Sequence, residues 1–260
     1  MDSRPNSSGR RTDTAVVIPA FNEEQSLPAL LRAVRESIPE ADIVVVNDGS
    51  ADRTAEVARA GGAQVLDLAC NMGVGTAVQG GFRYARDRGY EWVIRLDADG
   101  QHPPECIPTL LKNSRQTGAD LTIGSRFIAD GGYRSTRFRC LGIRCLAMFL
   151  SVICRRRVTD PTSGFQVLNR PLLHFFAEVY PVDYPEPEAL AILRRHGYDF
   201  AEVPIAFRER ASGRSSIRGW GTFYYMTKVF VALAIDRMKP KVERFERERM
   251  MAYLYGRTLV

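Results

Sequence analysis

The chain has 260 residues, of which 45% are hydrophobic and 25% are charged, so it has enough apolar material for an α/β domain with a sizeable core. Its 36 Lys and Arg residues exceed its 30 Asp and Glu residues by a formal charge of +6, which is compatible with phosphates or acidic lipid head groups as partners. The sequence has no nucleic-acid recognition motif and no basic run longer than residues 155–157, so nucleic acid is not indicated as a partner.

The cysteines and the apolar segments indicate a cytoplasmic protein. The five cysteines are odd in number and lack metal-ligand spacing, which predicts reduced thiols. Residues 1–13 are polar and predict a flexible tail rather than a signal peptide. Residues 140–154 and 222–235 are apolar, but Arg144 and Lys228 interrupt them, and spanning a bilayer takes about 20 mainly apolar residues. Neither segment is predicted to cross a membrane, and each could lie on a membrane surface or form a core helix.

Apolar β-branched runs alternate with helical patterns along the chain. Strands are predicted at residues 14–19, 42–46, 63–66 and 91–96, and helices at residues 27–38, 52–60 and 73–88, the last opening on a Gly-rich loop. Further candidate strands lie at residues 120–124, 164–168 and 201–207, and the charged residues 241–255 predict an exposed helix or tail. This alternation predicts an α/β fold with a mostly parallel sheet covered by helices.

Three polar turns follow predicted strands, at residues 21–23, 47–50 and 97–101. Ligands of parallel sheets bind beyond the carboxyl ends of the strands, so we expect these turns to meet at one site. Asp97 and Asp99 are separated by one residue, and Gly100 permits the turn that would bring both carboxylates to one cleft. Carboxylate oxygens suit Mg²⁺ or Mn²⁺, which would neutralise a diphosphate leaving group. His102 precedes two prolines and is interpreted as a structural residue.

A set of motifs in fixed order carries a resemblance across residues 14–217. The motifs are Pro19-Ala20-Phe21-Asn22-Glu23-Glu24, Asn47-Asp48-Gly49-Ser50, Asn71-x-Gly73-x-Gly75 and Asp97-Ala98-Asp99-x-Gln101. Together they resemble the family 2 glycosyltransferases, which have the GT-A fold. Similarity to the dolichol-phosphate mannose synthase-like branch is carried by Gly124-Ser125-Arg126, Asp160-Pro161-Thr162-Ser163-Gly164-Phe165 and Arg208-Glu209-Arg210-x-x-Gly213-x-Ser215.

The resemblance implies roles for the positions that match its motifs. It implies a nucleotide site formed by Pro19, Phe21, Glu23, Val46, Asp48, Asp97 and Ala98. It makes Asp99 and Gln101 the main metal ligands, with Asp97 as a third, and it makes Arg126 a contact to the phosphate of a lipid acceptor. Asp97, Asp99 and Arg126 are thus the expected catalytic residues, and Arg139 is a second candidate for the acceptor phosphate. Residues 14–217 would form the GT-A domain, and residues 218–260 an amphipathic helix and a charged tail.

Three positions depart from the family pattern. Asn47 replaces the first of two acids, Val74 stands where a Lys is common, and Ser216 stands where a Lys often follows the late Ser215. We therefore expect the cation that faces the diphosphate to come from the closing loop around Ser215, and the candidates there are Arg210, Arg214 and Arg218.

The functional alternatives differ in the group that accepts the sugar. A phosphate monoester has a second pKa of about 6, so it is largely dianionic at neutral pH and needs positioning and cations more than a base. A sugar hydroxyl normally needs a carboxylate base, and the candidates are Glu186 and Glu188, which could equally be acids at the start of a helix. A non-catalytic nucleotide-binding module of a membrane complex is a second alternative. A dinucleotide-dependent oxidoreductase would leave Asp99 and Gln101 unexplained.

The sequence thus predicts an inverting, metal-dependent hexosyltransferase that uses Mg²⁺ or Mn²⁺. It would move a sugar from a GDP- or UDP-linked donor to a polyprenyl, dolichyl-type phosphate while peripherally bound to the cytoplasmic face of a membrane. The apolar residues 140–154, flanked by arginines, are the candidate membrane-binding segment. Homo-oligomers and membrane-protein partners stay open, and so do the sugar, the base and the length of the lipid.

Overall fold

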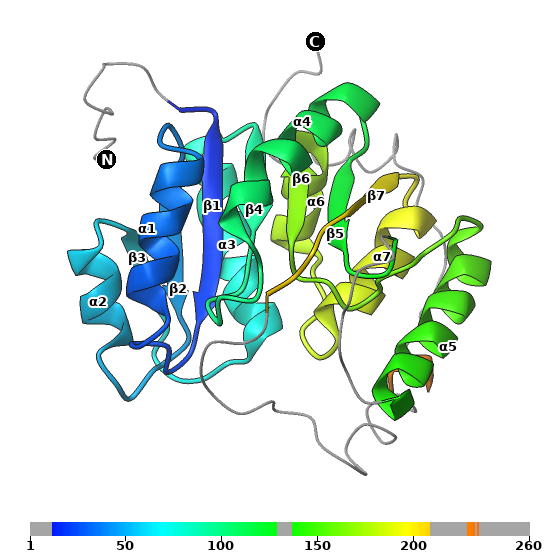
Figure 1. Cartoon of the computed structure of the whole chain (residues 1–260), viewed down its shortest axis with the longest axis horizontal. Coiled ribbons are helices and arrows are strands. Elements are labelled where there is room, and N and C mark those ends of the chain that lie inside the picture. The colour runs from blue at the N-terminus through cyan, green and yellow to red at the C-terminus, as the bar shows by residue number, and fades with distance from the viewer. Residues whose placement is uncertain (1–11, 129–136, 209–227, 232, 234–260) are drawn as a thin grey trace.

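The computed structural model of the chain describes residues 12–128, 137–208, 228–231 and 233, and of residues 137–139 it describes only the backbone. A seven-stranded sheet forms the centre of the molecule (Figure 1). Its strands are β1 (Thr14–Ala20), β2 (Asp42–Asn47), β3 (Gln64–Asp67), β4 (Trp92–Arg95), β5 (Leu121–Ser125), β6 (Gln166–Asn169) and β7 (Phe200–Pro204). Their order is β3-β2-β1-β4-β6-β5-β7, and β6 runs antiparallel to both of its neighbours.

Helices cover both faces of this sheet. They are α1 (Leu27–Ser37), α2 (Thr54–Ala60), α3 (Val74–Arg88), α4 (Ile107–Thr117), α5 (Arg137–Cys154), α6 (Arg170–Glu178) and α7 (Pro185–Arg195), with a 3₁₀ turn, η1 (Pro104–Cys106), before α4. Successive side chains of a strand point to opposite faces, so β1 contributes Val17 to one core and Val16 to the other. The Val17 core contains α3, α5, α6 and α7, and the Val16 core contains α1, α2 and α4.

The α/β fold and the position of every predicted strand are confirmed within a few residues. The last strand ends at Pro204 rather than at residue 207, because Phe207 leaves the sheet to pack against His102 with 5.0 Å between ring centroids. Folded structure also begins before the predicted boundary at residue 14. The carbonyl oxygen of Asp13 accepts hydrogen bonds from the amides of Glu91 and Trp92 at 2.8 and 3.0 Å.

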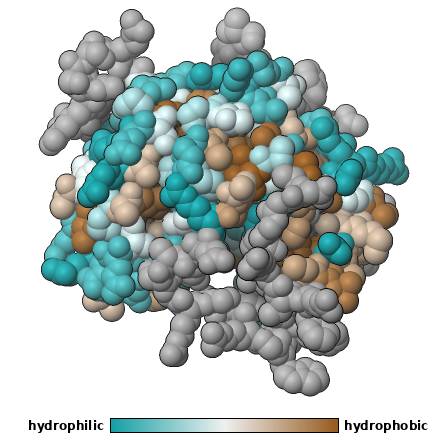
Figure 2. Space-filling model, viewed as in Figure 1, coloured by the Kyte–Doolittle hydropathy of each residue, from teal (hydrophilic) through white to brown (hydrophobic). Residues whose placement is uncertain are grey.

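Helix α5 contains the predicted apolar segment and begins three residues before it. One side is core, because Leu146 and Leu150 are fully buried. The other side carries Leu141, Met148 and Val152, whose exposed fractions are 60%, 68% and 73%. We call these three residues the α5 apolar stripe, and Figure 2 shows apolar side chains gathered over this part of the surface.

Part of the predicted C-terminal segment packs on the same core. Val229 and Leu233 are buried there, and the rings of Phe230 and Phe149 meet edge to face at 4.8 Å. Over the described part of the chain, no helix combines the length and the apolar character needed to cross a bilayer.

Candidate active site

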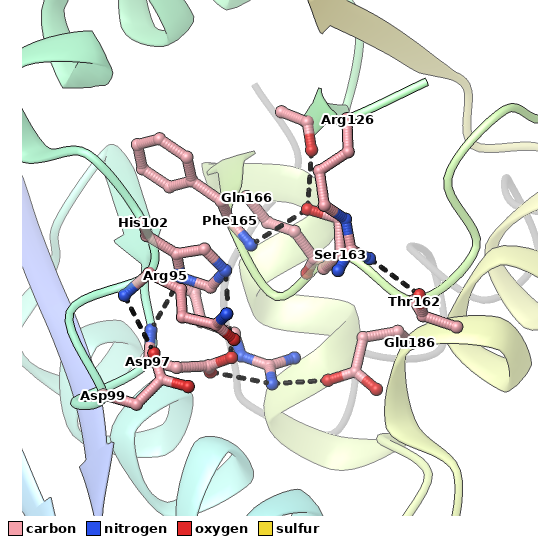
Figure 3. A network of polar contacts seen from close by, with 12 residues as sticks. Arg95, Asp97, Asp99, His102, Arg126, Thr162, Ser163, Phe165, Gln166 and Glu186 are labelled. Carbon is pink, nitrogen blue, oxygen red and sulfur yellow. Dashed lines mark hydrogen bonds and ion pairs between the residues drawn. The ribbon is translucent and has the colours of Figure 1, made fainter. Parts of the chain in front are cut away.

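The functional loops meet at the edge where the parallel strands end, at the bottom of Figure 1. Asp97 follows β4, and Arg126 follows β5. Since β6 is antiparallel, the loop that precedes it, residues 160–165, reaches this same edge. Glu186, in the first turn of α7, completes the polar network of Figure 3. The topology therefore collects side chains that are far apart in the sequence.

Asp97 sits in a tightly defined environment. An Nη of Arg95 lies 3.5 Å from its Oδ1, and a Cβ at Gly164 would come within 2.9 Å of both of its carboxylate oxygens. Position 164 therefore has to be glycine if Asp97 is to keep this orientation. Burial alone would raise the pKa of Asp97, but His102 and the guanidinium groups of Arg95 and Arg126 more than offset burial, so its pKa lies below the ordinary value. Asp97 is thus an ionised carboxylate at neutral pH.

His102 has the structural role that the sequence indicates. Its ring stacks on Phe165 at 5.3 Å, and its Nδ1 accepts a hydrogen bond of 2.9 Å from the amide of Asp97. Burial lowers the pKa of His102 to about 4, with Asp97 acting in the opposite direction, so the ring is neutral at pH 7. His102 fixes the backbone at Asp97; it lowers the pKa of Asp97 only when it is itself protonated, and at pH 7 the positive charge near that carboxylate comes from Arg95 and Arg126.

The oxygen donors after β4 fit a hard divalent cation. The amide of Gln101 donates to Oδ1 of Asp99 at 3.0 Å, and the carbonyl of Gln101 accepts from the amide of Arg208 at 2.9 Å. Among the described residues, no group of three acidic, imidazole or thiol side chains could hold a metal. Asp97, Asp99 and Gln101 are the expected ligands, and a cation held by two carboxylates and an amide would need substrate phosphates and water to complete its shell, as is usual for Mg²⁺.

Arg126 is held by an acid of the following motif. Its Nε and one Nη each donate to the Asp160 carboxylate at 2.7 Å, and that Nη also donates to Thr162 Oγ1 at 2.8 Å. The Arg126 side chain is 7% exposed, and that of Asp160 is fully buried. The guanidinium group also lies over the ring of Phe207, 5.1 Å from its centroid. A phosphate that bound Arg126 would share it with Asp160, a partner that the sequence did not suggest.

Glu202 on β7 holds the backbone of this loop, and the sequence analysis did not single it out either. Its carboxylate accepts hydrogen bonds from the amides of Thr159 and Asp160 at 2.9–3.0 Å. Burial raises the pKa of Glu202 although these amides act in the opposite direction. Ser163 adds a 2.6 Å hydrogen bond from its hydroxyl to the carbonyl of Gly124. The Gly-Ser-Arg and Asp-Pro-Thr-Ser-Gly motifs therefore form one bonded unit.

On the nucleotide side, Asp48 organises the loop between β3 and α3. Its two carboxylate oxygens accept hydrogen bonds from the amides of Met72 and Gly73 at 2.7 and 3.0 Å. Gly49 lets this loop approach, because its φ is +67° and a Cβ there would lie 2.4 Å from the carbonyl carbon of Cys70. Asp48 thus shapes the loop through its backbone, a function that can coexist with nucleotide binding.

The other expected nucleotide residues differ in how accessible they are. Phe21 is 45% exposed, and Glu23 accepts a 2.5 Å hydrogen bond from Ser26 Oγ on its carboxylate. The side chains of Val46 and Ala98 belong instead to the two hydrophobic cores, and Pro19 is buried as well. A nucleotide at this site would therefore meet these three residues mainly through their backbone, and their assignment to the nucleotide site stays a prediction.

Arg95 is a buried member of the site that the sequence analysis did not single out. It is 1% exposed, and its guanidinium group contacts Glu186 Oε1 at 2.5 Å and the Tyr180 hydroxyl at 2.9 Å. The signal was present in the sequence as a charged residue inside the apolar strand β4. Glu186, one of the two candidate bases, is thus bound to a cation, whereas Glu188 lies half-buried two residues further along α7.

Five residues that the sequence analysis assigns to the site have no described side chain. Arg210, Arg214 and Ser215 lie outside the described residues, as does the alternative cation Arg218. Arg139 belongs to the first turns of α5, where only the backbone is described.

Comparison with known proteins agrees with this arrangement of fold and motifs. The profile of "Glycosyl transferase family 2" matches residues 15–174. The undecaprenyl-phosphate mannosyltransferase of Micrococcus luteus is 32% identical over 78% of this chain and 86% of its own length. The polyprenol monophosphomannose synthase of Mycolicibacterium smegmatis is 33% identical over 83% of this chain and 85% of its own length.

Two further proteins extend the comparison. The dolichol-phosphate mannosyltransferase of Pyrococcus furiosus is 31% identical over 83% of this chain and 62% of its own length. Among solved structures, glucosyl-3-phosphoglycerate synthase from Mycobacterium tuberculosis in complex with Mn²⁺ and UDP-glucose superposes with a TM-score of 0.63 and 24% identity, covering 87% of this chain and 79% of that one.

The fold and the family match together define a glycosyltransferase of GT-A architecture. Within that class, the chain belongs to glycosyltransferase family 2, as its motifs predict.

Proposed function

We propose that the protein transfers a hexose from a nucleotide-diphosphate sugar to a polyprenyl phosphate, with inversion at the anomeric carbon. The names of the relatives from Micrococcus luteus and Mycolicibacterium smegmatis, both for polyprenyl-linked mannosyl transfer, support this acceptor class. The structural observation that carries the proposal is the bonded unit of Arg126 and Asp160 beside Asp97, which sets a buried guanidinium group next to the expected metal motif.

The chemistry divides between the two sides of the site. On the diphosphate side, Asp97, Asp99 and Gln101 would hold a divalent cation, which would offset the charge of the departing nucleoside diphosphate. A phosphate oxygen of the acceptor attacks the anomeric carbon while the bond to the diphosphate breaks. Arg126 orients that acceptor phosphate, and Asp160 keeps the guanidinium plane fixed.

Transfer to a sugar hydroxyl is the weaker alternative. It requires a carboxylate base that can take a proton. Glu186 is 16% exposed and lies 2.5 Å from an Nη of Arg95, so its carboxylate is already engaged in a buried ion pair. The dianionic phosphate acceptor has no such requirement, so the pairing of Glu186 favours a phosphate acceptor.

Peripheral attachment to the cytoplasmic face of a membrane is part of this proposal. The α5 apolar stripe projects three large side chains into solvent, and Arg144 is exposed on the same helix. Residues 155–157, all arginine and all exposed, follow the helix directly. An apolar stripe flanked by cations suits a surface of anionic lipids, which would also present the polyprenyl phosphate.

The direct test is transfer by the purified protein. GDP-mannose, UDP-glucose and related donors are incubated with a short polyprenyl phosphate and Mn²⁺ or Mg²⁺, and both nucleoside diphosphate release and lipid-linked sugar are measured. We expect release to depend on the polyprenyl phosphate. Release that needs a water-soluble sugar acceptor instead, with no lipid-linked product, would contradict the proposal.

A further inference from the structure

The guanidinium group of Arg95 lies in the core next to the expected metal motif. The neighbours of Arg95 on β4, Val93 and Ile94, are fully buried and apolar, and so is Leu96. Arg95 itself is 1% exposed, so its charge is almost completely removed from water. A guanidinium group in such a place needs ionic partners, because an isolated buried charge is strongly unfavourable.

The partners of Arg95 come from two sides. One Nη donates to Glu186 Oε1 at 2.5 Å and lies 3.5 Å from Asp97 Oδ1, whereas the other donates to the Tyr180 hydroxyl at 2.9 Å. A single nitrogen is therefore shared between two carboxylates, with Glu186 the closer of the two. Figure 3 shows the guanidinium group between the Asp97 and Glu186 side chains.

This pair is poorly explained as a device for stability alone. Buried ion pairs can often be replaced by apolar side chains of similar volume without loss of stability. Moreover, Nε of Arg95 is buried and has no hydrogen-bond partner among the described residues, which is an additional cost. The charge of Arg95 is kept despite these costs, which indicates that the charge itself has a function.

We propose that Arg95 is a positioning residue for Asp97 and that Glu186 is the counter-ion that balances its charge. Arg95 holds the Asp97 carboxylate in its place against Gly164, where a Cβ would clash with it. Glu186 draws the same nitrogen toward itself, so that the charge of Arg95 does not repel a divalent cation bound at Asp97. This inference rests on the proposed metal site, and it gives Glu186 a role other than that of a general base.

The substitution Glu186→Gln separates charge from hydrogen bonding. The amide oxygen of Gln can still accept from Arg95, so a merely structural role predicts little change. Loss of the negative charge leaves Arg95 unbalanced beside Asp97, and we expect Mn²⁺ affinity to fall about tenfold. Free Mn²⁺ is measured by electron paramagnetic resonance in the presence of UDP or GDP, and thermal unfolding monitors the fold.

A second variant and a control make the test specific. The double variant Arg95→Gln with Glu186→Gln removes one charge of each sign, so Mn²⁺ affinity should rise from the Glu186→Gln value toward the wild-type value, remaining below it because Arg95 no longer orients Asp97. Its turnover should stay low, because Asp97 has lost the group that orients it. Tyr180→Phe removes a hydrogen bond from Arg95 without changing any charge, so it should leave Mn²⁺ affinity unchanged.

Each outcome supports or overturns the inference. Unchanged Mn²⁺ affinity in Glu186→Gln, or no recovery in the double variant, overturns it. So does a slowing of turnover by about two orders of magnitude in Glu186→Gln at unchanged Mn²⁺ affinity, which is the behaviour of a general base. If the wild-type protein binds no Mn²⁺, the proposed metal site fails first and the inference with it. The expected Mn²⁺ pattern without transfer to polyprenyl phosphate would support the inference and reject only the proposed acceptor.

Discussion

Asp160 accepts two hydrogen bonds of 2.7 Å from Arg126, one from Nε and one from an Nη, and the Asp160 side chain is completely buried. This fork-to-carboxylate geometry fixes the plane of the guanidinium group as well as its position. The two residues belong to motifs separated by 34 positions, so the pair also joins the end of β5 to the loop before β6.

Arg126→Ala should have two separable effects. Loss of the acceptor-phosphate contact should abolish transfer to polyprenyl phosphate while the affinity for nucleotide is retained. Asp160 would be left as an unpaired buried charge, so the free energy of unfolding should fall by about 3–5 kcal/mol. Denaturant unfolding and the transfer assay measure the two effects on the same preparation.

The matched control for this prediction is the double variant Arg126→Ala with Asp160→Ala. Removing both charges should recover much of the stability but none of the transfer. Activity that returned together with stability would mean that Arg126 serves the fold and does not bind the acceptor.

Asp99→Ala should abolish transfer and the metal-dependent part of nucleotide binding. The reason is that Asp97 and Gln101 alone would leave a divalent cation with a single carboxylate from the protein. Calorimetric titration with UDP and GDP, with and without Mn²⁺, gives the measurement. Glu40→Ala, an exposed acid in the turn before β2, is the control and should behave as wild type. Wild-type transfer by Asp99→Ala in EDTA would refute the metal site.

Asp48→Ala should weaken nucleotide binding about tenfold or more. The carboxylate holds the amides of Met72 and Gly73, and without it the loop before α3 loses its fixed shape. Two hydrogen bonds are lost as well, so the free energy of unfolding should fall by about 1–3 kcal/mol. Asp48→Asn keeps one acceptor oxygen and should lie between Asp48→Ala and wild type. Nucleotide affinity that did not change in either variant would exclude this loop from the nucleotide site.

Replacing the α5 apolar stripe with serine, as Leu141→Ser, Met148→Ser and Val152→Ser together, should reduce binding to anionic vesicles at least tenfold. Burying each of these side chains in the lipid would contribute roughly 1–3 kcal/mol to the free energy of membrane binding. The three side chains are exposed, and their exposed surface is not part of the core. Flotation with phosphatidylglycerol vesicles at low and high salt provides the measurement. Arg32→Ser on α1 is the control. Equal binding of the triple variant and wild type would place the membrane contact elsewhere.

The strands and the motif residues were predictable because each leaves a local signature. The β-branched run at the start of β2 and the alternating spacing of Asp97 and Asp99 can be recognised without knowing any neighbour. Arg95, Asp160 and Glu202 are different. Their roles arise from partners 34 to 91 positions away, and the spacing of one sequence carries no record of such pairs.

Local signatures also left the surroundings of two candidate site residues open. Val46 lies next to a polar turn of the candidate site, and the alternation of the strand points its side chain into the core. Glu186 has the residue type and the placement of a base, and only the buried Arg95 shows that this acid is committed to a cation. Patterns therefore identified where the site lies, and the packing beneath it determined what its side chains can do.

The position of the antiparallel strand β6 affects how the sequence of such a protein can evolve. It inserts between β4 and β5, so the proposed donor machinery lies in residues 14–102 and the Arg126 unit in residues 121–202, in two adjoining halves of one sheet. The later half can therefore accumulate substitutions that suit a new lipid while the earlier half is inherited intact. Contacts between the halves limit this freedom: the counter-ion of Arg95 comes from α7 and the Asp97 carboxylate lies against Gly164, so a change at one of these positions affects its partner in the other half.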